Sequence, residues 1–286
     1  MDENKTQYIS LIGNPVEHSV SAEMHNAVFR KMGLDYIYSK IRVREANLKY
    51  VICGAKSINM KGFNVTLPYK QKIIPYLDEI DDSARMIGAV NTITIEDGVA
   101  KGYNTDGVGA VRAFNEVESV KDRKLVVLGS GGASRAICFQ SCIEGIGELV
   151  IVNRTVEKAE ALVDDIVSSG VISEEDISFS GLDDVDSVLE DSDFLMNTTR
   201  VGMYPNVDDV PLVGVEGLHS DLVVQDAVFN PLCTNLLKFA DSVDARTISG
   251  VKMLVYQGAE SLRLWLGIDA PCDLMEDVAV ESLLKY

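Results

Sequence analysis

The stretch LVVLGSGGASRA, residues 125–136, decides the fold of this 286-residue chain. An apolar segment runs into a glycine turn, and residues that favour a helix follow the turn. This order of strand, Gly-x-Gly-Gly turn and helix is typical of the first unit of a dinucleotide-binding domain. Gly129 permits the tight turn, Gly131 lets the backbone approach a pyrophosphate, and the amides that follow point at phosphates from a helix N-terminus. The segment therefore predicts a dinucleotide site.

The chain around this stretch alternates between strand-like and helix-like segments. The predicted strands are residues 124–128, 149–152, 177–180, 194–197, 222–226 and 245–248. Such alternation predicts a doubly wound parallel sheet of the Rossmann type, with helices on both faces. We expect this domain to cover residues 107–250.

The first 106 residues follow a different pattern. Residues 8–13 and 62–66 read as strands, residues 21–32 as an amphipathic helix that Ser21 could cap, and residues 89–95 as the first arm of a hairpin that turns at Gly98. These elements predict a separate α/β domain over residues 1–106. Two further helices are expected near residues 253–266 and 277–284.

Composition limits the function classes. The formal net charge of −18 disfavours nucleic acid and anionic membranes as partners. The N-terminus has no signal-peptide pattern and no apolar run is long enough to span a bilayer, so a cytoplasmic location is expected. The five cysteines include no CxxC and the three histidines show no metal-ligand spacing, so reduced thiols and no metal are predicted. A monomer and a homodimer both stay open.

The end of the second predicted strand indicates which dinucleotide binds. NAD sites usually place an acidic residue there, on the ribose 2′-hydroxyl. This chain instead has Asn153, Arg154 and Thr155, with Lys158 one turn later. Arg154 and Lys158 can pair with a 2′-phosphate, which a carboxylate would repel. The sequence favours NADP, although a basic helix start without function is the alternative.

Four polar residues are candidates for binding or chemistry on a substrate. Lys70 follows a strand and Pro68, and it is either a solvated lysine or an acid/base held against a substrate. Asp106 is either catalytic or part of a turn. Ser19 and Ser21 either cap a helix or receive a carboxylate at its N-terminus.

Several motifs, taken in order along the chain, resemble the shikimate dehydrogenase family. They are residues 19–21 (SVS), 64–70 (NVTLPYK), 88–92 (GAVNT), 104–107 (NTDG), 129–132 (GSGG), 153–155 (NRT), 197–203 (NTTRVGM), 230–231 (NP) and 250–257 (GVKMLVYQ). The resemblance covers essentially the whole chain. It implies reversible reduction of 3-dehydroshikimate to shikimate by NADPH, a step toward chorismate and aromatic amino acids.

The resemblance also implies residue roles. Lys70 would be the catalytic acid/base with Asp106 beside it, and Ser19 and Ser21 would hold the substrate carboxylate. The substrate hydroxyls would be read by Asn64, Thr66, Asn91, Asp106 and Gln257. The cofactor contacts would be Gly129, Ser130, Gly131, Gly132, Ala133, Asn153, Arg154, Thr155, Lys158, Ala227 and Gly250, with Asp82 near the nicotinamide. Residues 251–286 would pack back on the first domain, and the cleft between the domains would be the active site.

Two departures from expected patterns stand out. Ser134 occupies the third glycine position that is usual in dinucleotide-binding turns, and Phe229 stands where the shikimate dehydrogenase family often has tyrosine in its substrate site. Phe229 would lack one substrate hydrogen bond, worth about 0.5–1.5 kcal/mol. Two alternatives to shikimate dehydrogenase are a quinate/shikimate enzyme with broader acid or NAD use and a non-catalytic NADP-binding sensor. Retention of Lys70 and Asp106 argues against the sensor.

Overall fold

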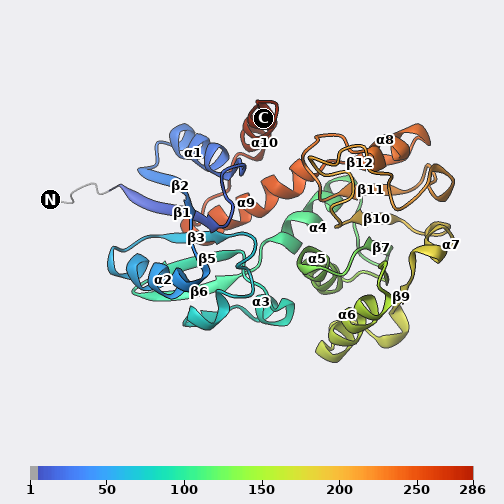
Figure 1. Cartoon of the computed structure of the whole chain (residues 1–286), viewed down its shortest axis with the longest axis horizontal. Coiled ribbons are helices and arrows are strands. Elements are labelled where there is room, and N and C mark those ends of the chain that lie inside the picture. The colour runs from blue at the N-terminus through green and yellow to red at the C-terminus, as the bar shows by residue number, and fades with distance from the viewer. Residues whose placement is uncertain (1–5, 286) are drawn as a thin grey trace. The chain divides into compact units, whose positions relative to one another are not determined.

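The structure, a computed structural model, describes residues 6–285 and divides into two compact units. The first unit runs to Thr105 and resumes at Gln257, and the second comprises Asp106–Tyr256. Each unit is built on its own six-stranded sheet (Figure 1). The chain passes from the first unit to the second before α4 (Asp106–Val117), and it returns within the helix α9 (Gly250–Leu266).

The first unit contains a mixed sheet. Its strands are β1 (Gln7–Gly13), β2 (Tyr36–Arg42), β3 (Gly62–Val65), β4 (Glu79–Ile80), β5 (Thr92–Glu96) and β6 (Val99–Tyr103). Their order is β2-β1-β3-β5-β6-β4, with β1 parallel to β2 and β3, and β5 antiparallel to β3 and β6. The predicted hairpin is therefore confirmed as β5 and β6. The sequence analysis had assigned neither β2 nor β4.

Helices cover both faces of this sheet, and strand alternation decides which side chains meet them. The helices are α1 (Ser21–Met32), α2 (Leu48–Ser57), α3 (Asp82–Ile87), the second half of α9, and α10 (Cys272–Leu283). Phe63 and Val65 of β3 pack with Ile52 of α2 in one core cluster. Asn64 lies between them and therefore points to the opposite face, where α9 brings Ser261. Helices α1 and α10 pack against each other, as predicted for the terminal helices (Figure 1).

The second unit contains the predicted parallel sheet. Its strands are β7 (Lys124–Leu128), β8 (Glu148–Val152), β9 (Ile177–Ser180), β10 (Phe194–Asn197), β11 (Val223–Asp226) and β12 (Arg246–Ile248). Every pairing is parallel and the order is β12-β11-β10-β7-β8-β9. The order reverses direction between β7 and β10, which is the switch point where such sheets bind their ligands.

Helices also flank the second sheet on both faces. They are α4, α5 (Gly132–Ile143), α6 (Val156–Ser169), α7 (Val185–Leu189) and α8 (Asn235–Ser242). Leu195 of β10 packs in a core cluster with Leu236 of α8, while its neighbour Phe194 meets Phe114 of α4 with ring centroids 4.9 Å apart. Adjacent residues of β10 thus serve opposite faces, as expected of a strand buried on both sides.

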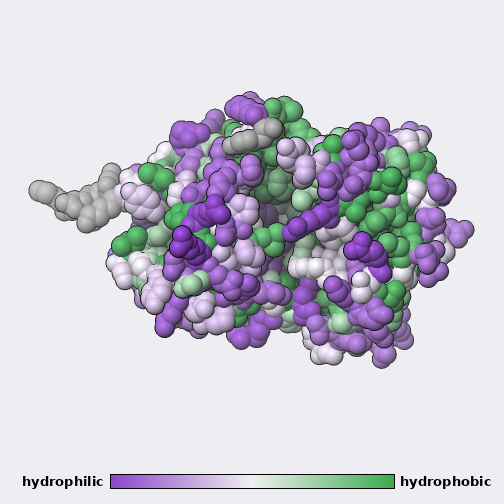
Figure 2. Space-filling model, in the orientation of Figure 1, coloured by the Kyte–Doolittle hydropathy of each residue, from purple (hydrophilic) through white to green (hydrophobic). Residues whose placement is uncertain are grey.

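The surface is mixed in character. Figure 2 shows hydrophilic residues interspersed with hydrophobic ones on the face in view, as expected of a chain with net charge −18. Within residues 6–285, no helix combines the length and apolar character that a membrane span needs.

Short 3-10 helices connect several elements at Glu45–Asn47, Ile74–Tyr76, Glu174–Asp176, Leu182–Asp184 and Val215–Gly217.

Candidate active site

The glycine turn after β7 has the shape that a dinucleotide requires. Gly129 adopts φ +110°, and a Cβ atom there would lie 2.6 Å from Thr198 Oγ1, so a larger residue is excluded on two grounds. Cβ atoms at Gly131 and Gly132 would meet nothing within 4 Å. The turn is therefore fixed on its inner side and open on its outer side. An open glycine edge at the start of α5 fits a pyrophosphate held by backbone amides.

Ser134, the departure from the glycine pattern, ties this turn to the neighbouring strand. Its Oγ accepts a hydrogen bond from Gly131 N at 3.1 Å and lies 2.5 Å from Thr198 Oγ1. Thr198 Oγ1 in turn donates to Leu128 O at 2.6 Å. A glycine at this position would allow close packing, whereas Ser134 forms a hydrogen-bonded link. The departure is therefore compatible with cofactor binding.

The end of β8 presents two cations. Asn153 Nδ2 donates to Thr155 O at 2.8 Å and holds the turn that leads into α6. Arg154 and Lys158 are exposed, and neither forms an ion pair with any residue in the described range 6–285. No carboxylate among the described residues therefore neutralises these cations, and they are available to a phosphate. Together with the open glycine edge, these side chains fit an NADP molecule.

Three further residues with predicted cofactor roles lie elsewhere. Ala227 N donates to Asn197 O at 2.8 Å, which fixes the backbone just after β11. Gly250 begins α9, where a Cβ would lie 2.5 Å from Val228 O, so only glycine fits. Asp82 belongs to the first unit, as an exposed residue at the start of α3, and the cap of that helix is Asp81. The role of Asp82 stays a prediction.

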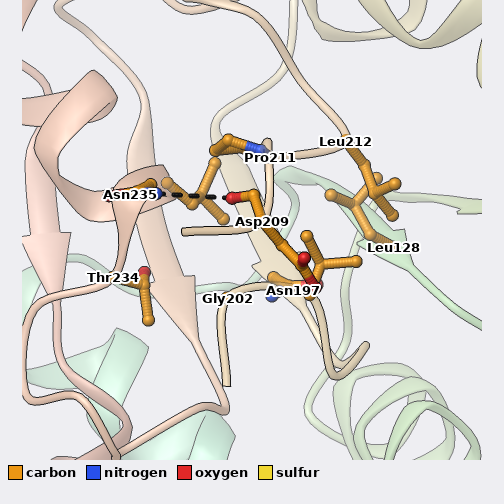
Figure 3. A pocket seen from close by; sticks show the side chains of 10 residues that line it. Leu128, Asn197, Gly202, Asp209, Pro211, Leu212, Thr234 and Asn235 are labelled. Atoms are coloured by element: carbon orange, nitrogen blue, oxygen red, sulfur yellow. Dashed lines mark hydrogen bonds between the residues drawn. The ribbon is translucent and has the colours of Figure 1, made fainter. Parts of the chain in front are cut away.

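A small pocket lies next to the glycine turn within the second unit (Figure 3). Leu128, Asn197, Gly202 and Thr234 are among the residues that line it. Asn235 Nδ2 crosses it to donate to the carbonyl of Asp209 at 3.3 Å. None of the predicted site residues lines this pocket.

A buried carboxylate orders the backbone on that side of the turn. Asp226 accepts hydrogen bonds from Asn197 Nδ2 at 2.8 Å, Val228 N at 3.0 Å and Thr234 Oγ1 at 2.7 Å. Burial raises the pKa of Asp226, and the three donors lower it in part. Because Asp226 is fully buried behind the loops that follow β10 and β11, its role is to hold them in place.

In the first unit, Ser19 and Ser21 lie together at the start of α1. Ser19 Oγ donates to Ser21 Oγ at 3.1 Å and accepts from Ser21 N at 3.2 Å. The suggestion that Ser21 caps α1 is wrong, because Ser21 is the first helical residue and the cap position, Val20, has no side-chain hydrogen bond. Lys40 Nζ donates to Ser19 O at 2.8 Å and pairs with Glu23 at 3.2 Å. An ion pair between Lys40 and Glu23 thus lies behind the two hydroxyls, and the hydroxyls themselves are the donors open to a carboxylate.

Asn64 and Asn91 belong to a buried network of amides and hydroxyls. Asn64 Nδ2 donates to Thr92 Oγ1 and to Ser261 Oγ, each at 3.0 Å. Asn91 Oδ1 accepts from Thr105 N at 2.8 Å, and Thr92 Oγ1 lies 2.9 Å from Ser261 Oγ. The network joins β3, β5, α9 and the segment that leads to Asp106. Because every member is buried and hydrogen-bonded, the amide orientations are fixed before any substrate arrives.

Tyr38 and Ser261 are two members of this layer that sequence reasoning missed. Tyr38 Oη donates to Asn64 Oδ1 at 2.7 Å, which leaves the Asn64 amide nitrogen to face the hydroxyl network. Burial raises the pKa of Tyr38, and a hydrogen bond with Ser21 lowers it in part. Tyr38 therefore contacts two residues with predicted substrate roles. The alternating aromatic residues of β2 and the position of Ser261 one helical turn after Gln257 were the available signals.

Lys70 is anchored through its backbone and its neighbour. Val90 N donates to Lys70 O at 2.8 Å, and Tyr69 Oη donates to Val43 O at 2.7 Å. Thr66 directly follows β3, Lys70 lies four residues later, and both are half-buried. The structure therefore brings Ser19, Ser21, Asn64, Thr66, Lys70, Asn91 and Gln257 into one unit.

Asp106 and Phe229 belong to the second unit. Asp106 is buried and begins α4, so it is a helix residue and not part of a turn. It directly follows Thr105, a member of the amide and hydroxyl network. Phe229 is half-buried in the segment after β11. Residues 6–285 contain no cluster of His, Cys, Asp and Glu side chains suited to a metal ion.

Comparison with known proteins places this arrangement in a family. The model of the shikimate dehydrogenase substrate binding domain matches residues 11–93, that of shikimate/quinate 5-dehydrogenase matches residues 111–204, and that of the shikimate 5′-dehydrogenase C-terminal domain matches residues 250–280. A shikimate dehydrogenase (NADP+) from Methanocaldococcus jannaschii is 49% identical over 284 residues, which are 98% of this chain and 99% of that protein.

Solved structures agree with these matches. A crystal structure of a shikimate dehydrogenase in complex with NADP+ has a TM-score of 0.93 and 49% identity, covering 99% of this chain and 98% of that one. The shikimate 5-dehydrogenase of Listeria monocytogenes, in complex with shikimate and NAD, has a TM-score of 0.90 and 34% identity, covering 96% of this chain and 97% of that one. The chain belongs to the shikimate dehydrogenase family.

Proposed function

We propose that this protein catalyses the reversible reduction of 3-dehydroshikimate to shikimate with NADPH, a step in the biosynthesis of chorismate and the aromatic amino acids. The observation that carries the proposal is the buried network around Asn64 and Asn91, adjoining Lys70. It offers amides and hydroxyls with fixed orientations, which suits a small polyhydroxylated acid. The first unit would bind the substrate, with residues 251–286 completing it, and residues 107–250 would bind NADP.

The chemistry requires a proton at the ketone oxygen. NADPH, when bound, supplies the hydride that the carbonyl carbon accepts. Lys70 Nζ, in its protonated form, neutralises the negative charge that grows on that oxygen and transfers a proton to it. Asp106 accepts a hydrogen bond from the hydroxyl that forms at this oxygen, and it orients the ammonium group of Lys70. One hydride and one proton thus convert the ketone to a secondary alcohol.

The remaining polar residues hold the substrate. The hydroxyls of Ser19 and Ser21 receive the carboxylate. Asn64, Thr66, Asn91 and Gln257 read the ring hydroxyls. Ser21, Asn64 and Gln257 lie in α1, β3 and α9, and hydrogen bonds of the buried network hold Asn91, so binding costs little reorganisation of these side chains. Phe229 adds a ring without a hydroxyl, and it lowers affinity more than it changes the reaction.

The cofactor residues hold NADP by its pyrophosphate and by its 2′-phosphate. The turn from Gly129 to Ala133, including Ser130 and Gly132, would receive the pyrophosphate. The 2′-phosphate would be received by Arg154 and Lys158, together with their neighbours Asn153 and Thr155. Ala227 and Gly250 would approach the nicotinamide half of the molecule, with Asp82 near its ring. We expect the reaction to take place in the cytoplasm.

The test of the function is the initial rate of nicotinamide reduction, followed by absorbance. Shikimate and quinate are each offered with NADP+ and with NAD+. Turnover with shikimate and NADP+ supports the proposal. Comparable rates with quinate or NAD+ would assign the protein to the broader quinate/shikimate enzyme, which the matched family description also covers. Tight NADP+ binding without turnover of either acid would favour a sensor.

The role of Lys70 is tested with a matched pair of variants. Lys70→Ala should lower kcat by about 10²–10⁴ while KM for shikimate changes little. Lys72→Ala is the control, because Lys72 lies two residues away and pairs with Glu45 at 2.6 Å. Near-normal turnover of Lys70→Ala would remove Lys70 from the mechanism. Light scattering on the same preparations distinguishes a monomer from a homodimer.

A further inference from the structure

The basic side chains of the second unit fall into two groups. Most of them are engaged within the protein. Ion pairs with carboxylates involve Arg123, Lys124, Arg135 and Arg246. Contacts of other kinds engage three more: Arg112 and Lys252 lie over the ring of Tyr256, and Lys238 donates to Asn235 Oδ1 at 3.2 Å. Among the engaged side chains, Arg135 belongs to α5, the helix that follows the glycine turn, and its guanidinium group pairs with Asp165. In a chain with 44 acidic and 26 basic residues, a paired cation is the expected state.

The second group consists of Arg154, Lys158, Arg200 and Lys121, whose side chains have no ion pair, side-chain hydrogen bond or cation–π contact in the described part of the chain. Three of the four follow the carboxyl-terminal ends of strands in the parallel sheet. Arg154 and Lys158 follow β8, and Arg200 follows β10. Because β8 and β10 are the two parallel neighbours of β7, these cations flank the glycine turn from opposite sides. The sequence analysis gave no role to Arg200.

The backbone of Arg200 is held firmly beside that turn. Thr199 N and Thr199 Oγ1 donate to Asn197 Oδ1 at 3.0 and 2.7 Å. Val201 N donates to Thr199 Oγ1 at 3.3 Å, and Met203 N donates to Arg200 O at 3.1 Å. Hydrogen bonds therefore fix the chain on both sides of Arg200, while its side chain stays exposed.

The same segment is linked directly to the glycine turn. Thr198 stands two residues before Arg200, and its Oγ1 lies 2.5 Å from Ser134 Oγ. Ser134 Oγ also accepts a hydrogen bond from Gly131 N. The segment that carries Arg200 is therefore joined to the turn at Gly131 through Thr198 and Ser134. A guanidinium group binds phosphate oxygens through two parallel N–H groups, and little entropy is lost when its backbone is already ordered.

We propose that Arg200 is a third phosphate-binding cation of the dinucleotide site, acting from the β10 side of the glycine turn. This inference rests on the proposed binding of NADP. The ligand chemistry is a phosphate oxygen, and NADP offers two sources, its pyrophosphate and its 2′-phosphate. A third cation also offsets the repulsion between a protein of net charge −18 and a polyanionic cofactor.

The test is the dissociation constant of NADP+ and of NAD+, measured by titration calorimetry on the full-length protein at low salt. Arg200→Ala should raise Kd for NADP+ by about 5- to 30-fold, and Arg200→Lys by less, because lysine keeps the charge but loses the two-pronged contact. The matched control is Lys121→Ala. This variant removes the same charge from an exposed, unpaired site that precedes β7, at the opposite edge of the sheet.

The two cofactors separate the two phosphate sources. A loss confined to NADP+ assigns Arg200 to the 2′-phosphate, and an equal loss for NADP+ and NAD+ assigns it to the pyrophosphate; either result supports the inference. An Arg200→Ala variant whose Kd values match those of Lys121→Ala overturns it. The Kd values of Arg154→Ala, measured in parallel, test the proposed NADP site separately from the role of Arg200. If wild type fails to bind NADP+, or Arg154→Ala binds it unchanged, the cofactor assignment itself is at fault.

Discussion

His25 gives the protein a pH-dependent stability that can be calculated from its surroundings. The imidazole is fully buried on α1, stacked on Tyr38 at 4.4 Å and edge-on to Trp265 at 5.7 Å. Neither ring nitrogen has a hydrogen-bond partner among the described residues. Burial therefore lowers the pKa of His25 to about 3, so the folded protein keeps this side chain neutral.

The direction of the effect follows from the two states. The unfolded chain binds a proton at an ordinary histidine pKa of about 6.5, while the folded chain resists protonation down to about pH 3. Between these values the unfolded state holds more protons, so stability falls as the pH falls. Lowering the pH from about 7.5 to about 5 should cost about 2 kcal/mol of unfolding free energy through His25 alone.

The perturbation is His25→Phe, which keeps an aromatic ring and removes the titrating group. Any packing cost of the larger ring does not depend on pH, so it cancels when one variant is compared at two pH values. Urea unfolding is followed by the fluorescence of Trp265, the single tryptophan, which lies in the same unit as His25. We expect wild type to lose about 2 kcal/mol more than His25→Phe between about pH 7.5 and about pH 5.

A control removes a different imidazole from the same unit. His18 is exposed in the loop before α1, and His18→Gln should follow the wild-type pH dependence. If His25→Phe loses as much stability as wild type on acidification, the imidazole of His25 is not the source of the effect, and the reasoning from its burial fails.

Two further predictions concern hydrogen bonds behind the sites. Tyr38→Phe deprives Asn64 Oδ1 of its donor and should raise KM for shikimate by about 2- to 12-fold with little change in kcat; an unchanged KM in the rate assay would show that Asn64 needs no such support. Ser134→Ala breaks the link from Gly131 to Thr198 and should weaken NADP+ binding by a similar factor, about 2- to 12-fold, while KM for shikimate stays constant. Equal NADP+ affinity in calorimetry would mean that the turn is ordered without Ser134.

Much of the fold could be predicted because its signals are local. The strands of the second unit and the helix at residues 21–32 follow from runs and periods of apolar residues, and their bounds in the structure differ by at most one residue from those expected. The strand β2 (YIYSKIR) was missed, although its alternating tyrosines were a strand signal, because Ser39, Lys40 and Arg42 interrupt any apolar run. Its place at the edge of the sheet, paired only with β1, lets such a sequence serve as a strand.

Parts of the candidate site could also be predicted. The turn at Gly129 and the cations at Arg154 and Lys158 stand within one strand–turn–helix unit and the next strand, so their spacing carries the information. The cap assigned to Ser21 was wrong because the chemistry of a serine does not fix whether it lies before or inside the first helical turn. The structure decides this through the backbone of Val20.

The sequence by itself determined the two α/β units, the glycine turn and the preference for a phosphorylated dinucleotide, because each depends on residues close together in the chain. Only the tertiary structure decided which side chains support the sites. Asn64 meets Ser261 across 197 residues, Tyr38 reaches Asn64 from another strand, and Ser134 reaches Thr198 from another element. Such hydrogen bonds act over about 3 Å, so they depend on strand order, register and helix packing, which local patterns do not specify.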